Sequence, residues 1–396
     1  MRKLFLSLLV YGGCAQAAVI YDHDETSLNV GGFVKAVMYD GNNYKKNLGR
    51  NANTLVNSSR FNISGQHRFY KDFSLLAFSE WNMPNGRGSK ESLSSRDQYL
   101  GISSKKYGKL IVGKFTDFNT TVLGMTGVND DFGSIHRGDT SGDRRSGQIK
   151  YLYDNNGYTF GLGYQTSADS VPVVGVKDNV KSGYSVLLGY TFDDVHGKPL
   201  AIKTSYSLLN SKDFDDEKWG EEDYLQFSKL KQICAGISWG RKTEGLYLAA
   251  GVDRYILRYT YPDNIYSSEF IDDIEDYYND VDVDPSFYSK IGARMDVRGL
   301  DLAAVYTFEN GIQTVASFNI SNYKYYFDGV IDDIDFYIRH LILNVNYSYK
   351  NLYLFAEFDI PLKVTGFRDP DEKEDLCNLF ELNTKTTAAF GAKYIF

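Results

Sequence analysis

The chain has 396 residues, of which 51 are acidic and 43 basic, with a formal net charge of -8 and a mean hydropathy of -0.36. Its 32 Tyr, 25 Phe and 36 Gly against only 7 Pro exclude a disordered chain, which is poor in aromatics, and collagen, which needs abundant Pro. No apolar run reaches about 18 residues, which excludes a helical membrane protein and leaves the transmembrane β-barrel, where only alternate strand residues face lipid.

Residues 1–17 have the features of a secretory signal peptide. Met1–Lys3 gives a basic start, Leu4–Val10 an apolar stretch and Ala15–Ala17 a small-residue cleavage pattern, in a segment too short to span a bilayer as a helix. Cleavage here would leave one barrel domain, residues 18–396, with a net charge of -10, because two basic residues are removed. We therefore expect an exported protein.

The cysteines leave two questions open. Cys14 follows the apolar stretch, where lipidated cysteines occur, but Tyr11 is a poor substitute for the aliphatic residue expected three positions earlier, so cleavage is favoured. In the mature chain Cys234 lies in an apolar strand-like run and Cys377 in a charged segment. We expect two unpaired thiols rather than a disulfide.

Short segments with a period of two residues recur from Leu28 to the carboxy terminus. There are 16 of them: Leu28–Tyr39, Arg60–Tyr70, Phe73–Met83, Gln98–Lys105, Lys109–Phe115, Gly147–Tyr153, Tyr158–Thr166, Gly183–Phe192, Leu200–Asn210, Gln232–Gly240, Leu246–Tyr259, Leu300–Phe308, Ile312–Tyr323, Phe336–Tyr349, Leu352–Ile360 and Thr386–Phe396. Tyr288–Val297 is a seventeenth candidate. Because a barrel with both termini on one side needs an even number of strands, we predict 16 and keep 18 as the alternative.

The connectors between these segments alternate in length. Short ones such as Glu309–Gly311 and Lys350–Asn351 are rich in Gly and Asn, as tight turns are. Seven are long: Asp40–Ser59, Pro84–Asp97, Thr116–Ser146, Ser167–Ser182, Ser211–Lys231, Thr260–Phe287 and Leu362–Lys385. Short turns on one side and long loops on the other are typical of a bacterial outer-membrane barrel.

The faces of the segments agree with this architecture. In the second segment Phe61, Ile63 and Phe69 share one face, and the other face carries Arg60, Asn62, Ser64, Gln66 and Arg68. In the last segment Phe390 and Tyr394 share an apolar face and Lys393 lies opposite. Apolar residues outside and polar residues inside suit a bilayer and a water-filled lumen, although two soluble sheets packed face to face would also bury such faces.

Both ends of the mature chain resemble the general porins of Gram-negative outer membranes. Ala18–Asp22 (AVIYD) and Val30–Ala36 (VGGFVKA) look like the first strand of that family, and Gly391–Phe396 (GAKYIF) looks like its last. The hairpins Tyr306–Gly311 and Ser348–Leu352 also look familial. The resemblance implies an all-β transmembrane barrel of 16 strands, a homotrimer, and passive passage of small hydrophilic solutes.

The resemblance also implies a constricted pore, since porins fold the third long loop into the lumen against a ladder of basic residues. That loop is Thr116–Ser146 here, and its Gly127–Gly133 segment, with Asp130 and Asp131, matches the family's acidic segment loosely because the Pro-Glu-Phe-Gly-Gly sequence is absent. Carried over by position, the basic ladder is Lys35, Arg60, Lys114, and Arg144 or Arg145. Lys114 has the parity of the apolar Leu110 and Val112, which indicates a bulge or a mismatch.

The terminal aromatics have a second implied role. In the family, the outer-membrane assembly machinery recognises a carboxy-terminal Phe preceded by alternating apolar residues, and Tyr394 and Phe396 match that pattern. The alternative is that Phe396 only ends an amphipathic strand.

The sixth long loop carries the largest concentration of acid. It holds nine acidic residues and no basic one: Asp263, Glu269, Asp272, Asp273, Glu275, Asp276, Asp280, Asp282 and Asp284. A solvated external loop is the default interpretation, and cation enrichment at the pore mouth or divalent bridging to lipopolysaccharide phosphates is the alternative. The segment lacks the Gly and distal Glu of an EF-hand, so we assign no metal site.

No catalytic, cofactor or nucleic-acid motif is present in the sequence, so we expect a channel rather than an enzyme. His67 or His340 would be the base of a barrel hydrolase if one existed. A sugar-specific channel and a surface-binding adhesin barrel are the remaining alternatives. The net negative charge and the acidic loop favour mild cation selectivity.

Overall fold

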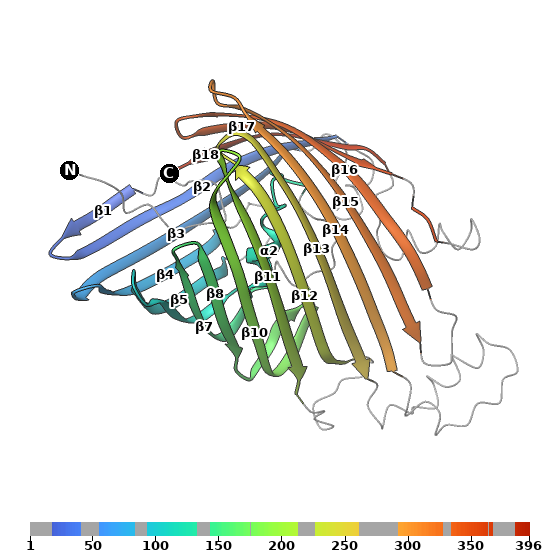
Figure 1. The fold of residues 1–396 in the computed structure, drawn as a ribbon, viewed down its shortest axis with the longest axis horizontal. Helices are drawn as coiled ribbons and strands as arrows, with labels where there is room; N and C mark the ends of the chain where they lie inside the picture. Colours follow the sequence, from blue (N-terminus) through green and yellow to red (C-terminus); the bar gives the residue numbers. More distant parts are fainter. Residues whose placement is uncertain are drawn as a thin grey trace, which may run out of the picture.

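The computed structural model describes residues 18–40, 55–83, 93–132, 143–174, 176–212, 226–260, 292–327, 334–362, 364–366 and 385–396, which form one β-barrel (Figure 1). The expected signal peptide, the acidic Asp263–Asp284 segment and Cys377 lie outside the described residues. No helix within the described ranges is both long and apolar enough to cross a membrane.

Neighbouring strands are antiparallel, and one short helix interrupts them. The elements are β1 (Ala18–His23), β2 (Thr26–Asp40), β3 (Leu55–Tyr70), β4 (Phe73–Met83), β5 (Ser94–Ser104), β6 (Gly108–Phe115), α2 (Asn119–Leu123), β7 (Arg145–Asn155), β8 (Tyr158–Gln165), β9 (Ala168–Val173), β10 (Val176–Val195), β11 (Lys198–Ser211), β12 (Gln226–Arg241), β13 (Glu244–Thr260), β14 (Gly292–Thr307), β15 (Ile312–Phe327), β16 (Ile334–Tyr349), β17 (Leu352–Pro361) and β18 (Thr387–Ile395).

The barrel closes where the last strand pairs with β2. Lys393 faces Lys35 across this seam, and the backbone of Phe396 exchanges two hydrogen bonds of 2.8 and 3.0 Å with Gly32. Of the 18 strands in the sheet, β1 extends along β2 and β9 along β10, and the other 16 form the closed ring. The prediction of 16 strands is confirmed.

Two segments differ from their predicted form. The candidate strand Tyr288–Val297 is not separate, because Gly292–Thr307 runs as one strand, β14, paired along its length with β13 and β15. Charged residues and a glycine in its middle interrupt the apolar alternation, which made one strand look like two. The predicted long loop Ser167–Ser182 contains β9, whose Val171 and Val173 are buried in an apolar cluster with Leu209 and Phe227.

Exposure along the strands confirms the outward apolar face. In β18, Phe390 and Tyr394 are exposed, whereas Thr387 and Ala389 are buried. In β6, Leu110 and Val112 are exposed and Ile111 is buried. Alternation of this kind around the ring gives the barrel an apolar outer surface and a polar interior.

The wall has two heights. β4, β5 and β7 have 11 residues each and β6 and β8 have 8, whereas β12, β14, β15 and β16 have 16 each and β10 has 20. A strand needs about 9 to 11 residues to cross a bilayer. We call β4–β8 the short wall and β10–β16 the long wall.

Candidate pore constriction

The third loop leaves β6 and turns into the barrel, where α2 lies inside the ring (Figure 1). Its root is held by a buried ion pair between Asp117 and Arg145, with 3.1 Å between Oδ2 and Nη2. Asp117 Oδ1 also accepts a hydrogen bond of 2.9 Å from the backbone N–H of Asn119, at the start of α2. Arg145 is 1% exposed, so it anchors the loop and does not line the lumen, and of the two predicted alternatives Arg144 is the one left for the wall.

The helix is fixed to the long wall by polar contacts. The amide nitrogen of Asn119 donates to Ser207 Oγ and Gln232 Oε1, each at 2.7 Å, and Ser205 Oγ donates to Asn119 Oδ1 at 2.8 Å. All four side chains are buried. Buried polar groups that satisfy one another in this way specify one position for the helix.

Beyond the helix the loop continues along β12 to β14. Tyr247 donates its hydroxyl to the carbonyl of Met125 at 2.7 Å, and Thr126 Oγ1 donates to Asp301 Oδ2 at 3.1 Å. Met125 packs on β12 where Gly236 has no side chain, since a Cβ there would lie 3.0 Å from Met125 Sδ. The loop therefore adheres to the wall instead of crossing open water.

A lysine in the turn between β12 and β13 also holds this part of the loop. Lys242 Nζ donates to the carbonyls of Gly124 and Gly127, at 2.8 and 2.9 Å. Burial lowers the pKa of Lys242 from its usual value of 10.5 to about 8.

The loop tip is fastened by one carboxylate of β17. Glu357 accepts the backbone N–H groups of Asp130, Asp131 and Phe132 at 2.8, 3.2 and 2.7 Å. Asn344 on β16 donates to the same carboxylate at 3.0 Å. Glu357 is fully buried, and its two oxygens accept from three loop N–H groups and from Asn344.

The fastened tip presents its two acids to the barrel seam. Asp131 forms an ion pair with Lys35 of β2, and Asp130 lies 3.9 Å from Lys393 of β18. Asp130 also accepts a hydrogen bond of 2.6 Å from the hydroxyl of Tyr353. Phe132 is buried at the seam among Val37, Ile342, Phe355 and Ala389.

The remaining predicted basic residues lie on neighbouring strands beyond the seam. Arg60 of β3 lies 3.8 Å from Glu80 of β4, which also pairs with Arg96 of β5 at 2.6 Å. Arg144, just before β7, pairs with Asp97 at 2.7 Å. The ring order places these strands across the lumen from β12–β14, to which the loop adheres.

Lys114 joins this group through a bulge in β6. The register with β7 shifts between Gly113 and Phe115, and Gly113 has a φ of +146°, a conformation that favours glycine. The shift takes Lys114 off the outward face of Leu110 and Val112, and its Nζ donates to Ser95 Oγ at 2.9 Å. The bulge resolves the parity conflict in the sequence.

Sequence reasoning missed five charged residues that contact the loop tip or the predicted basic residues: Glu80, Arg96, Asp97, Glu357 and Lys393. Arg96 has the parity of the exposed Leu100 and Ile102, and it pairs with Glu80 because the register of β4 and β5 shifts between Ser79 and Trp81. It also fell in a predicted loop, because β5 begins at Ser94, before its apolar pattern does. Lys393 was visible as the polar residue opposite the apolar face of the last strand. Glu357 is an acid at an inward position of β17, a signal that parity alone could have supplied.

The other predicted residues lie apart from the constriction. Tyr394 is exposed on the outer face, and Phe396 ends the chain at the seam. His67 is exposed and its Nδ1 lies 2.8 Å from Thr26 Oγ1, whereas His340 is buried and its Nδ1 lies 2.6 Å from Asp359 Oδ1. Cys234 is buried in β12. The described ranges contain no cluster of three or more His, Cys, Asp or Glu suited to a metal ion.

Comparison with solved structures gives the same architecture. The Salmonella typhi OmpF complex with daunomycin matches with a TM-score of 0.66 at 14% identity, covering 96% of this chain and 100% of that one. A loop-deletion mutant of OmpT, an outer membrane protein of Vibrio cholerae, matches with 0.61 at 14% identity, covering 94% and 100%. An anion-selective porin from Comamonas acidovorans matches with 0.54 at 12% identity, covering 94% and 100%.

Sequence comparison identifies the family. The profile described as Gram-negative porin matches residues 6–330, most of the chain. With the closed barrel of 16 strands and the inward third loop, this match shows that the chain belongs to the Gram-negative porin family of outer-membrane channels.

Proposed function

We propose that the protein is a general diffusion porin for small hydrophilic solutes and ions, with mild cation selectivity. The observation that carries the proposal is the fastened loop tip, which holds Asp130 and Asp131 at the start of a charged band formed by Lys35, Arg60 and their neighbours. A water-filled passage between acidic and basic side chains has a transverse electric field. Such a field orients dipolar and zwitterionic solutes and disfavours apolar ones.

The selectivity proposal rests on charges of both signs in this passage. Glu80 and Asp97 pair with Arg96 and Arg144, so these two arginines are partly neutralised, and Asp130 and Asp131 add charge of the sign that attracts cations. The net charge of -10 for residues 18–396 acts in the same direction. The anion-selective porin with the same fold supports the view that side chains, not architecture, decide selectivity.

We also propose a homotrimer whose copies meet at the short wall. Strands of 8 residues, such as β6 and β8, are shorter than a bilayer crossing requires. A neighbouring copy would cover the outer surface of the short wall, whose height does not match the thickness of the lipid. A structure described as a trimer form of Vibrio cholerae OmpT, with a TM-score of 0.58, supports this assembly. Export with cleavage after residue 17, recognition of Tyr394 and Phe396 during assembly, and contact with lipopolysaccharide are part of the same proposal.

Planar-bilayer recording tests the function. The purified protein should give large, nearly ohmic steps in groups of three, and a potassium chloride gradient should give a reversal potential of the cation-selective sign. Blockade by one particular oligosaccharide would indicate a sugar-specific channel. Absence of conductance would refute the porin function, and a clear anion preference would refute the selectivity.

A further inference from the structure

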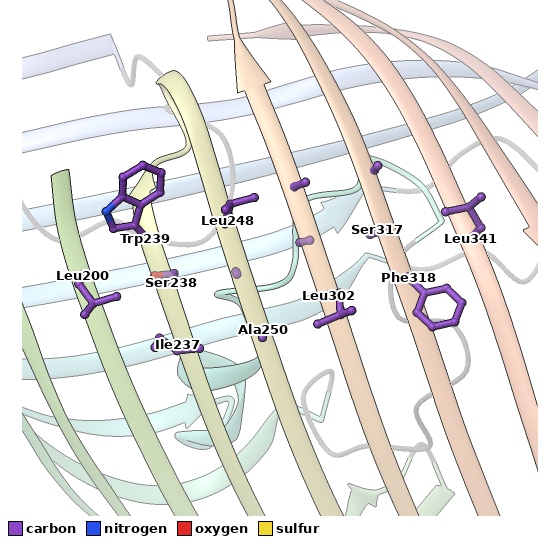
Figure 2. A pocket seen from close by; sticks show the side chains of 14 residues that line it. Leu200, Ile237, Ser238, Trp239, Leu248, Ala250, Leu302, Ser317, Phe318 and Leu341 are labelled. Atoms are coloured by element: carbon purple, nitrogen blue, oxygen red, sulfur yellow. The ribbon is translucent and has the colours of Figure 1, made fainter. Parts of the chain in front are cut away.

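The outer face of the long wall contains an apolar groove of about 430 Å³ (Figure 2). Its sides are formed by Trp239, Leu248, Leu302 and Phe318, among others. Leu248 and Leu302 are exposed, so the groove opens to the outside of the barrel and not to the lumen. It is independent of the constriction described above.

Small residues produce the floor of the groove. Ala250 pairs with Leu302, and Ala304 pairs with Ala316, in adjacent rows of the sheet. The buried neighbours of these alanines, among them Ala249 and Ala303, point to the other face, so the three alanines point outward. Three short side chains between large ones leave a furrow that larger side chains would fill.

The groove ends at the side of the barrel that carries the short turns, beside the side chain of Lys198. Trp239 lies two residues before the end of β12, and its Nε1 donates to the carbonyl of Val195 at 2.8 Å. Lys198 Nζ lies 4.9 Å from the Trp239 ring and donates to the carbonyl of Leu246 at 2.8 Å. Tryptophan and lysine at this height are typical of the boundary between acyl chains and headgroups.

The rim carries charges of both signs. Arg241 and Glu244 of the next turn form an exposed pair at 2.7 Å, and Asp194, also exposed, accepts the backbone N–H of Gly197 at 2.7 Å. An apolar furrow that leads to a lysine flanked by acids complements an amphiphile with an apolar chain, a phosphate and an amine. The short turns of such barrels face the periplasm, so the leaflet at this height is the periplasmic one.

We infer that this groove binds one zwitterionic glycerophospholipid of the periplasmic leaflet, with an acyl chain over Ala250, Ala304 and Ala316 and its phosphate at Lys198. The site lies on the long wall, away from the short wall where copies are proposed to meet. It requires the placement in the outer membrane but not the conductance, so failure of either leaves the other intact.

Native mass spectrometry of the detergent-solubilised full assembly, titrated with dioleoyl phosphatidylethanolamine, tests the inference. The unaltered protein should retain one lipid per chain under activation that removes other adducts. Filling the groove with Ala304→Leu and Ala316→Leu should weaken retention by about fourfold for each acyl methylene displaced. Lys198→Gln should weaken it by roughly the several-fold that one charge contributes at a membrane surface.

The matched control is Ala356→Leu, which enlarges an outward position of β17 outside the groove and should leave retention unchanged. Single-channel conductance equal to that of the unaltered protein shows that each variant is folded, and Lys198→Gln keeps the test valid if the double variant does not fold. Equal lipid retention in the filled and control variants would overturn the inference. Loss of the oligomer in the filled variant would also overturn it, because the groove would then be a contact between copies.

Discussion

The two sides of the proposed constriction are held in place by different means. On the acidic side, Asp130 and Asp131 sit on a loop whose backbone is fastened by the buried Glu357 and by Asn119. On the basic side, Arg60, Arg96 and Arg144 project from or beside strands and are positioned by ion pairs with neighbouring acids. The acidic side therefore depends on a tertiary contact, whereas the basic side follows from the barrel itself. Releasing the loop tip should therefore cause channel closures, whereas substitutions on the basic side should change ion selectivity without closures.

The largest effect is expected from releasing the loop tip. In Glu357→Gln one acceptor oxygen replaces the carboxylate that receives three backbone N–H groups, and losing hydrogen bonds to a charged group costs about 1.5 to 3 kcal/mol. Single-channel traces should show altered conductance and frequent closures. Glu80→Gln, on the basic side, is the control and should change selectivity without closures. Single-channel traces of Glu357→Gln without added closures would mean that the carboxylate does not hold the loop.

The next effect concerns the charge of the tip. Replacing both Asp130 and Asp131 by Asn should reduce cation preference more than replacing Asp272 and Asp273 of the sixth loop by Asn. Charges in a narrow passage are screened less than charges on a solvated loop, where the Debye length is about 10 Å at 0.1 M salt. Reversal potentials under a potassium chloride gradient provide the comparison. An equal effect of the two pairs would place the selectivity outside the third loop.

A smaller and opposite effect is expected from the basic side. Arg96→Gln or Arg144→Gln should raise cation preference, by roughly the twofold expected of one partly paired charge, and leave conductance nearly unchanged. Arg241→Gln, in an exposed turn outside the lumen, is the control. If either lumen variant produced the closures expected of Glu357→Gln, the distinction between the two sides would fail.

The smallest effect concerns pH and the loop anchor Lys242. Its pKa is about 8 in the folded protein and 10.5 in a model compound, so between these values the unfolded chain binds more protons. Its unfavourable contribution to folding therefore diminishes as pH rises. The melting temperature of the unaltered protein should rise relative to that of Lys242→Met between pH 7 and pH 9.5. A constant or falling difference would show that Lys242 is solvated.

The sequence alone predicted the number of strands and the direction of their side chains, because both follow from the alternation of apolar and polar residues. The 16 strands, the outward Phe390 and Tyr394, and the inward side of the second strand all follow from a period of two residues. The short strand β9 was missed because it is held by tertiary burial and not by an alternating pattern. The strand β14 was predicted as two segments because inward charged residues interrupt its alternation.

The candidate site was only partly predictable, because its contacts join distant segments. The contact between Asp130 and Glu357 spans 227 residues, and no local pattern indicates that these two meet. Arg144 and Arg145 are adjacent, and only the buried Asp117 identifies Arg145 as the anchor. Lys114 reaches its place through the bulge at Gly113, which reverses the parity that the sequence suggests.

Thiol modification at the loop tip tests the central claim most directly, namely that Asp131 lies at the narrowest part of an open channel. Asp131→Cys should conduct, and a bulky methanethiosulfonate reagent should then reduce its single-channel conductance in successive steps. The unaltered protein, which retains the native Cys234 and Cys377, is the control for native thiols, and its conductance should not change with the reagent. Conductance that stays unchanged after complete modification of Asp131→Cys would contradict the account.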